Sequence, residues 1–288
     1  MPSTAAKEWP LIAFTLLSQI AVGALWTVTA AVLFSREARS GGALYRPSWR
    51  GLVAVIALVV IAAAFSFFHL GRPRRAVFAL ANFRRSWLSR EIFFELAFLV
   101  MVVFLAVVSR RRGEDTALLE GAFILASVLG VLFLGSMAKI YMLRTVPSWR
   151  GLHTPLSFFL SAAVLGPLAA ASGGPFVLAF PARAGAFING VLVSVLAAVA
   201  LIVLTVLLFT PKIGFLGTKK NTLLEFPARR MYPFLVFRFL FLAAAVLMIA
   251  LYHEVERGPL MILAFVSALT AEALGRYLFY AIYGRLGV

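Results

Sequence analysis

The sequence predicts an all-α integral membrane protein that folds as an eight-transmembrane-helix bundle. Three observations carry this prediction. Of the residues, 62% are hydrophobic and only 13% are charged, and eight apolar stretches are long enough to cross a bilayer. Nearly every ionisable residue inside these stretches falls toward the same side of the membrane. Because eight spans of about 20 residues use most of a 288-residue chain, we expect one polytopic membrane domain over residues 1–288.

The apolar runs set the spans in order. The first follows Lys7 and Glu8, whose charges cancel, and it is too long for a signal-peptide core, so we expect an uncleaved first helix. The second and fifth runs each follow a PSWRGL hexapeptide, and arginines 110–112 separate the third from the fourth. Arg183 precedes the sixth run and Arg257 precedes the eighth. The predicted spans are 11–34, 51–70, 91–109, 118–141, 154–171, 184–209, 233–252 and 259–282.

An even number of spans puts both chain ends on one membrane face, which we call the terminal face. The loops 71–90, 142–153 and 210–232 share it, and they carry more Lys and Arg than the loops of the opposite face. The positive-inside rule therefore favours a cytoplasmic terminal face. The net charge of +16 is read as loop charge that meets lipid headgroups or an acidic partner, since no nucleic-acid-binding motif is visible.

The Cys and His content limits the cofactors of this chain. There are no cysteines, so the chain supplies no thiolates for an iron–sulfur cluster, a structural zinc site or a disulfide. His69 and His153 fall at one membrane surface and His253 near the other. A pair of stacked b-type haems is thereby excluded, and a single haem between His69 and His153 is disfavoured because both lie at span boundaries.

The hexapeptide PSWRGL occurs twice, at 47–52 and 147–152. An odd number of predicted crossings separates the copies, so they fall on opposite faces. This pattern is compatible with an inverted three-helix repeat of the kind found in transporters. Chance recurrence of interfacial Pro, Trp and Arg is an equally weighted alternative.

Ionisable residues inside the spans are candidates for function, because a charge in hydrocarbon is costly. Glu272 and Arg276 have the i, i+4 spacing that favours pairing on one helix stripe. The alternatives are structural: this pair neutralises itself, Arg238 and Lys139 snorkel to the surface, and Glu91 caps a helix. The candidates are Glu91, Glu95, Lys139, Arg238, Glu272 and Arg276, with His69 at a helix end beside them.

Four stretches carry a specific resemblance. They are HLGRPRRAVFALANFRRSWLSRE at 69–91, YMLRTVPSW at 141–149, TPLSFFLSAAVLG at 154–166 and EALGRYLFY at 272–280. Together they resemble the membrane-anchor subunit of dimethyl sulfoxide reductase over nearly the full length. HLGRP followed by SWLSRE is the most specific part.

The resemblance implies an eight-helix anchor without haem in the bacterial cytoplasmic (inner) membrane. It implies attachment to an iron–sulfur subunit and, through it, to a molybdopterin catalytic subunit that serves anaerobic respiration, with menaquinol as electron donor. Family anchors are usually drawn with both termini in the periplasm, against the charge rule. Docking of the partner on Arg74, Arg75, Arg84 and Arg85 would reconcile the two.

The family implicates the His of HLG and the Glu of SRE at the quinol site, and these match His69 and Glu91. Imidazole and carboxylate suit the binding and deprotonation of quinol hydroxyls. We expect Arg72, Arg90 and Glu95 to complete the site. The chain would then be a non-terminal subunit of an oxidoreductase complex, with quinol oxidation here and substrate reduction in another subunit. Two roles are open for the nearby phenylalanines: they line the quinone site, or they only pack the helices together. These residues are Phe65, Phe67, Phe68, Phe93 and Phe94.

Two other functions stay open. A secondary transporter would use the repeat and the protonatable residues, but it normally places its site near the bilayer midplane between broken helices. A quinone-reactive anchor of another molybdopterin oxidoreductase, of the polysulfide or nitrite type, would share this site and differ in its catalytic partner.

Overall fold

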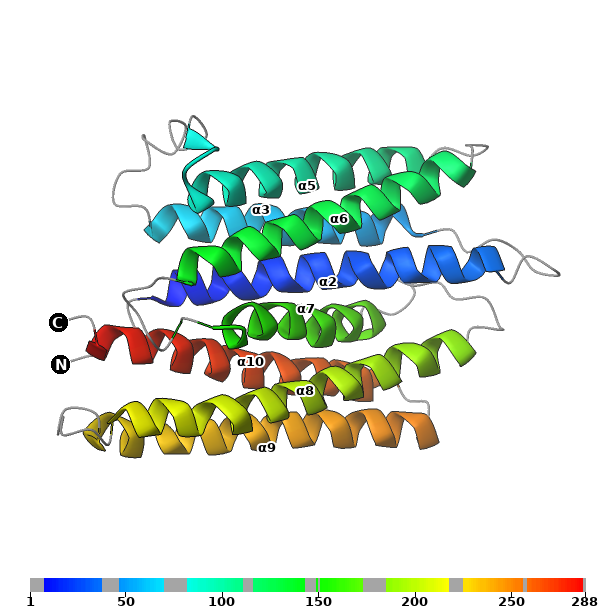
Figure 1. Cartoon of the computed structure of the whole chain (residues 1–288). Coiled ribbons are helices and arrows are strands. Elements are labelled where there is room, and N and C mark those ends of the chain that lie inside the picture. The colour runs from blue at the N-terminus through cyan, green and yellow to red at the C-terminus, as the bar shows by residue number, and fades with distance from the viewer. Residues whose placement is uncertain are drawn as a thin grey trace.

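The computed structural model describes residues 8–37, 47–69, 82–110, 116–142, 149, 151–172, 185–217, 225–255 and 258–286. Within these ranges the regular structure is α-helical apart from a single 3₁₀ residue, and the eight long helices run roughly antiparallel along the chain (Figure 1). They are α2 (Trp9–Glu37), α3 (Trp49–His69), α5 (Trp87–Arg110), α6 (Thr116–Tyr141), α7 (His153–Ser172), α8 (Gly185–Gly217), α9 (Glu225–Val255) and α10 (Gly258–Leu286). The predicted fold class is confirmed.

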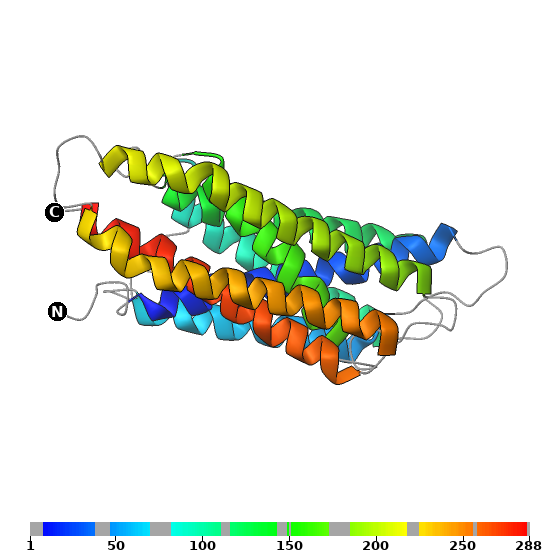
Figure 2. The same ribbon diagram turned by 90° about the horizontal axis from the view of Figure 1, so that it is seen from below.

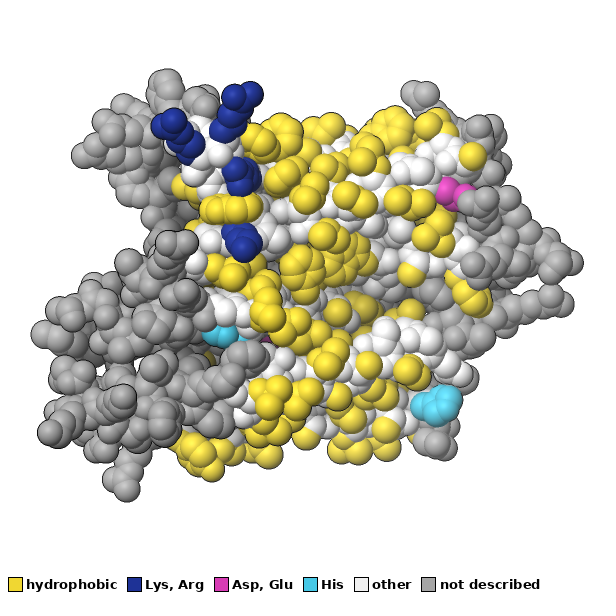
Figure 3. All heavy atoms as spheres, in the orientation of Figure 1, with side chains coloured by type: hydrophobic (Ala, Val, Ile, Leu, Met, Phe, Trp, Pro, Cys, Tyr) yellow, Lys and Arg dark blue, Asp and Glu magenta, His cyan; other side chains and the backbone are white. Residues whose placement is uncertain are grey.

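Each of these eight helices contains a stretch long and apolar enough to cross a membrane. Apolar side chains cover the middle of the visible face, as expected for a surface that meets lipid (Figure 3). The chain is therefore a multi-pass membrane protein. With 33 and 31 residues, α8 and α9 are about 50 Å long and exceed the ~30 Å hydrocarbon core.

The start of α5 differs from the predicted span, which began at residue 91. The helix begins at Trp87, because Ser86 caps it: the Ser89 N–H donates a hydrogen bond of 3.3 Å to the Ser86 Oγ. Glu91 consequently lies one turn inside the helix rather than at its first residue.

The helices pack as two groups of four. One half contains α2, α3, α5 and α6, and the other contains α7, α8, α9 and α10 (Figure 1). The halves meet chiefly where α2 lies along α7, and α2 is the most enclosed span. Both chain ends lie at the same end of the bundle (Figure 2).

Two glycines allow α2 and α7 to approach closely. A Cβ atom added to Gly23 would overlap the carbonyl oxygen of Ala162, and one added to Gly166 would overlap the backbone of Gly23. Close backbone approach at small residues is the usual way in which helices associate within lipid. The joint between the halves therefore depends on Gly23 and Gly166.

The described residues of the two PSWRGL copies adopt different structures at opposite ends of the bundle. Trp49 begins α3 and is 38% exposed, whereas Trp149 is 5% exposed and precedes the start of α7. Gly151 has a φ of 153°, a conformation that favours glycine, while Gly51 is helical. The position of the two copies at opposite ends of the bundle is compatible with an inverted three-helix repeat. The helices, however, pack as two groups of four, and α2 and α7 run in the same direction (Figure 1). The inverted repeat stays a prediction.

Candidate functional site

The described residues of the predicted quinol site, Arg90, Glu91 and Glu95, lie on α5 at the terminal end of the first half. α3 ends at His69 where α5 begins nearby, and the two helices pack together (Figure 1). The side chain of His69 and the residues Arg72, Arg74 and Arg75 lie outside the described part of the protein. Of the predicted quinol-site residues, Glu91 and Glu95 have side chains that the structure describes and that lie in the bundle interior.

Glu91 and Glu95 are buried carboxylates one helical turn apart. Their exposed fractions are 5% and 8%, and they continue the interior stripe of α5 that includes Phe98 and Val102. The Glu95 Oε1 atom is buried without a hydrogen-bond partner among the described residues. A buried acidic group without full pairing is costly, so this stripe is a candidate ligand or proton site.

A hydrogen-bonded tyrosine pair interacts electrostatically with Glu91. The hydroxyl groups of Tyr141, at the end of α6, and Tyr280, on α10, are 2.9 Å apart. Glu91 is within electrostatic range of both, and Thr15 of α2 makes a polar contact with Tyr280. We call Thr15, Glu91, Tyr141 and Tyr280 the tyrosine layer. It brings polar side chains from four helices and from both halves together near the terminal face.

Sequence reasoning did not single out the tyrosines. The available signal was their place in the motifs, since Tyr141 begins YMLRTVPSW and Tyr280 ends EALGRYLFY. Trp149 of the first motif holds the second in place: its ring stacks on that of Phe279 at 4.9 Å, and its Nε1 donates a hydrogen bond of 3.0 Å to the Phe279 carbonyl oxygen. The motif residues therefore meet in space and support the tyrosine layer.

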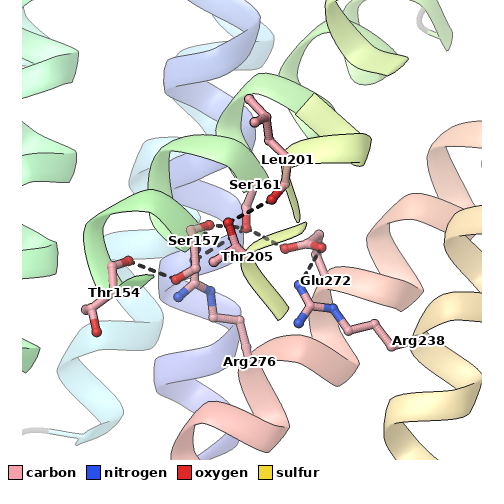
Figure 4. Close-up of polar contacts among 8 residues, drawn as sticks. All are labelled: Thr154, Ser157, Ser161, Leu201, Thr205, Arg238, Glu272 and Arg276. Carbon is pink, nitrogen blue, oxygen red and sulfur yellow. Dashed lines mark hydrogen bonds and ion pairs between the residues drawn. The ribbon is translucent and has the colours of Figure 1, made fainter. Parts of the chain in front are cut away.

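A second polar group lies deeper, between α7, α9 and α10 (Figure 4). Arg238 Nη2 is 3.1 Å from Glu272 Oε1, and the Ser161 Oγ donates a hydrogen bond of 2.5 Å to Glu272 Oε2. Arg276 donates bonds of 3.2 Å to the Ser157 carbonyl oxygen and 3.4 Å to the Ser161 Oγ. We call Ser161, Arg238, Glu272 and Arg276 the ionic network.

The ionic network differs from the expected pair within one helix. Glu272 makes its ion pair with Arg238 of α9, while Arg276 reaches Ser161 of α7 and lies 3.7 Å from the centre of the Phe158 ring. Gly275 makes room for Arg238, because a Cβ there would lie 2.7 Å from the guanidinium carbon. The polar atoms on neighbouring helices thus decide the pairing.

Lys139 does not share the burial of this group. Its side chain is exposed near the end of α6. Arg84 and Arg85 are exposed as well, and basic side chains gather over this part of the visible face (Figure 3). The structure therefore groups Arg238, Glu272 and Arg276 in the interior. Lys139 lies at the surface, in agreement with the alternative that its side chain snorkels to the surface.

Arg90 holds the segment that precedes α5. Its guanidinium donates bonds of 3.0 Å to the Phe83 carbonyl oxygen and 2.7 Å to the Arg84 carbonyl oxygen, and it lies 4.2 Å from the Trp87 ring centre. These contacts anchor the loop. A contact of Arg90 with quinol stays a prediction.

Of the phenylalanines predicted to line the quinone site, some are exposed at the surface and others pack against aromatic neighbours. Phe83, Phe93 and Phe94 form an edge-to-face cluster with ring centres 5.0–6.1 Å apart. Phe65 packs edge-on against Trp9, while Phe67 is exposed. Phe93 is also exposed, so this cluster borders lipid beside the buried face of Glu91.

The tyrosine layer and the ionic network join along α10. Arg276 is one turn from Tyr280 and interacts electrostatically with both tyrosines and with Glu272. The resulting track of hydroxyl, carboxyl and guanidinium groups provides hydrogen-bond donors and acceptors, and it provides groups that exchange protons. Among the described residues, no cluster of three or more His, Cys, Asp or Glu side chains has the arrangement of a metal site.

Comparison with known proteins identifies a family and several relatives. Residues 3–282 match the family described as DMSO reductase anchor subunit (DmsC). The anaerobic dimethyl sulfoxide reductase chain YnfH of Escherichia coli is 34% identical over 170 residues, 57% of each protein. A chain of the anaerobic dimethyl sulfoxide reductase of Haemophilus influenzae is 30% identical over 166 residues, 58% of each protein.

A further relative has a different name. A subunit of the sulfite dehydrogenase of Allochromatium vinosum is 34% identical over 139 residues, 42% of this protein and 41% of the relative. The matches to the two dimethyl sulfoxide reductase chains span somewhat more than half of their length. The family match, in contrast, extends over nearly all of the sequence and confirms the resemblance found in the motifs. The chain belongs to the DMSO reductase anchor subunit family.

Proposed function

We propose that this protein is the membrane anchor and menaquinol-oxidising subunit of a molybdopterin-containing reductase of the dimethyl sulfoxide reductase type. The observation that carries the proposal is the position of Glu91. It is a buried carboxylate within electrostatic range of a hydrogen-bonded tyrosine pair, at the bundle end where α3 ends at His69. Relatives named as dimethyl sulfoxide reductase chains support the partner class.

Oxidation of one quinol releases two electrons and two protons. Glu91 and His69 accept hydrogen bonds from the two quinol hydroxyls and take up the protons. The tyrosine hydroxyls orient the head group, and the Phe93 surface contacts its apolar part. The electrons leave for an iron–sulfur partner subunit, since a chain without cysteine provides no cluster ligands of the usual kind.

The basic residues at the terminal face form the docking surface for that partner. Arg84 and Arg85 are exposed there, and Arg74 and Arg75 are close to them in sequence. Cationic side chains around the quinol site attract an acidic partner and orient it on this surface. The nearest iron–sulfur cluster of the partner then lies close to the quinol head group. The partner then passes electrons to the molybdopterin catalytic subunit.

Replacement of Glu91 by Gln in the assembled complex tests the quinol role. We expect quinol-driven substrate reduction to fall by about a hundredfold or more, because the amide cannot accept a proton. Reduction driven by an artificial dye, which bypasses the anchor, should be unchanged. Glu120→Gln is the matched control, because Glu120 is 6% exposed on α6 near its opposite end and should leave quinol-driven turnover intact. Normal quinol-driven turnover of Glu91→Gln would refute the proposal.

The sulfite dehydrogenase relative favours a second candidate. That relative is named as a subunit of a sulfite dehydrogenase. If this chain serves a dehydrogenase, electrons flow toward the quinone. The site in this protein is compatible with both directions, because the same groups bind and release protons. Assays of the purified complex with a quinol and a sulfoxide, and then with a quinone and sulfite, distinguish the two.

The transporter alternative has its own test. A transporter purifies without an iron–sulfur protein, whereas an anchor copurifies with one. Mild extraction from the membrane followed by iron and labile-sulfide analysis separates the two functions. Purification without any partner that contains an iron–sulfur cluster would favour the transporter function over the anchor function.

A further inference from the structure

Several buried polar atoms lie in the interior without a partner among the described residues. In the first half they include the Nε2 and Oε1 atoms of Gln19, the Oγ of Ser18 and the Oε1 of Glu95, and in the second half they include the Arg238 Nε. Gln19 and Ser18 are fully buried on α2. Each unpaired buried group costs on the order of 1–3 kcal/mol, and native proteins pair such groups with protein atoms or with ordered water.

Helical register places the first-half group directly beneath the tyrosine layer. On α2 and α5, which run inward from the terminal face, Gln19 follows Thr15 by four residues and Glu95 follows Glu91 by four. On α6 and α10, which run toward that face, Met137 precedes Tyr141 by four and Arg276 of the ionic network precedes Tyr280 by four. Residues four apart share a helix face and differ by about 6 Å in depth. We call Ser18, Gln19, Glu95 and Met137 the inner layer.

Contacts one turn deeper show that α2, α5 and α6 converge there. A Cβ added to Gly130 of α6 would lie 2.8 Å from Val22 of α2 and 3.3 Å from Phe98 of α5. Val22 lies one turn beyond Ser18, and Phe98 lies one turn beyond Glu95. Phe98 also packs against Phe133, with ring centres 6.4 Å apart. The inner layer therefore has an apolar floor below and the tyrosine layer above.

We propose that the inner layer is a water site, in which bound water molecules connect Glu95 with Gln19 and Ser18. Unpaired donors and acceptors on converging helices provide the two to four partners that a buried water requires. An amide, a hydroxyl and a carboxylate are the side chains that such water bridges. In the ionic network both oxygens of the Glu272 carboxylate are paired, and among the described residues the Arg238 Nε is its buried atom without a partner.

The role of this water rests on the proposed function. Oxidation of one quinol sends two electrons to the partner subunit and leaves two protons on the anchor. One of them is held by His69. The other passes from Glu91 through the inner-layer water to Glu95, and it returns to the terminal face when the quinone leaves. Glu95 thereby frees Glu91 to accept the next hydrogen bond.

Met137 provides a direct probe of the water. It is fully buried in the inner layer, and Met261 is 3% exposed in the apolar cluster of the second half. X-ray radiolysis of the intact complex generates hydroxyl radicals from bound water, and these oxidise adjacent methionines. We expect Met137 to be oxidised at least about tenfold faster than Met261. Equal protection of the two would show a dry inner layer and would overturn the proposal.

Two variants connect the water with its role. Gln19→Leu removes both polar atoms, so Met137 oxidation should fall toward the Met261 level and quinol-driven turnover should fall about tenfold, less than the roughly hundredfold loss of a direct proton-transfer group. Ser136→Ala is the control, because the Ser136 hydroxyl already donates to carbonyl oxygens of its own helix at 2.7–2.9 Å. It should change neither measurement.

The outcomes separate this inference from the proposed function. Rapid Met137 oxidation with unchanged turnover in Gln19→Leu overturns the proton relay. Normal quinol-driven turnover in Glu91→Gln overturns the proposed function and leaves the Met137 result as the test of the water. A protected Met137 with an inactive Glu91→Gln overturns the water site alone.

Discussion

Buried carboxylates of the two halves have similar burial and different surroundings. Glu272 in the second half is 2% exposed, and Arg238 and Ser161 pair its two oxygens. Glu95 in the first half is also buried, and its Oε1 has no partner among the described residues. A carboxylate with both oxygens hydrogen-bonded holds the helices of its partners together. A buried carboxylate with an unpaired oxygen can still bind a ligand or a proton. Burial alone therefore does not identify the site.

Removing the partner of Glu272 should give the largest effect on stability. Arg238→Met leaves the carboxylate buried without its cation, which costs about 3–5 kcal/mol. Reversible unfolding of the detergent-solubilised protein measures the change. The double variant with Arg238→Met and Glu272→Met should recover most of the loss, because a well-packed apolar pair replaces the ion pair. A double variant as unstable as the single one would show that the network does more than satisfy its own charges.

Loss of the Ser161 hydroxyl should have the next largest effect. Ser161→Ala removes a charged hydrogen bond to Glu272 and one of the acceptors of Arg276, at a cost of about 1.5–3 kcal/mol. The same unfolding measurement applies. Ser194→Ala is the control, because this hydroxyl bonds to its own helix at an exposed position of α8 and should contribute little. Equal effects of the two would contradict a special role for Ser161.

The tyrosine pair should contribute an intermediate amount. Tyr280→Phe deletes the 2.9 Å hydrogen bond to Tyr141 and leaves that hydroxyl with one partner fewer, at a cost of about 0.5–1.5 kcal/mol. Quinol-driven turnover should fall as well, because the hydroxyl groups orient the head group in the proposed site. Dye-driven turnover measured in parallel separates an assembly defect from a quinol defect.

Glu95 should show the smallest effect on stability. Glu95→Gln changes a group that is already incompletely paired, so the free energy of unfolding should change by less than about 1 kcal/mol in either direction. Quinol-driven turnover should nevertheless fall. A large destabilisation would mean that Glu95 is a structural residue like Glu272, and the contrast between the halves would disappear.

The candidate site was predictable in part. Charged residues in apolar runs identified Glu91, Glu95, Arg238, Glu272 and Arg276, since few residues in a span are ionisable without a reason. The pairing was not predictable, because the i, i+4 rule considers one helix and the structure offered Glu272 a partner on α9. Tyr141 and Tyr280 are 139 positions apart, and no local pattern relates them.

The repeated hexapeptide makes the same point from identical residues. Trp49 begins a helix at the bundle surface, while Trp149 is buried against Phe279 and donates a hydrogen bond to its backbone. Its aromatic neighbours are Tyr141 of α6, which is close in sequence, and Phe279 of α10, which is 130 positions away. Six shared residues therefore specify neither a helix start nor a buried contact by themselves.

The sequence by itself determined the eight spans, their approximate bounds and the membrane location, because a helix in lipid must satisfy its own backbone and cover about 30 Å with apolar side chains. It also carried the family motifs of a bacterial membrane anchor. Only the tertiary structure decided which polar side chains are paired, because pairing depends on the approach of separate helices. The Gly23–Gly166 joint, the α9–α10 ion pair and the tyrosine layer all arise from that approach.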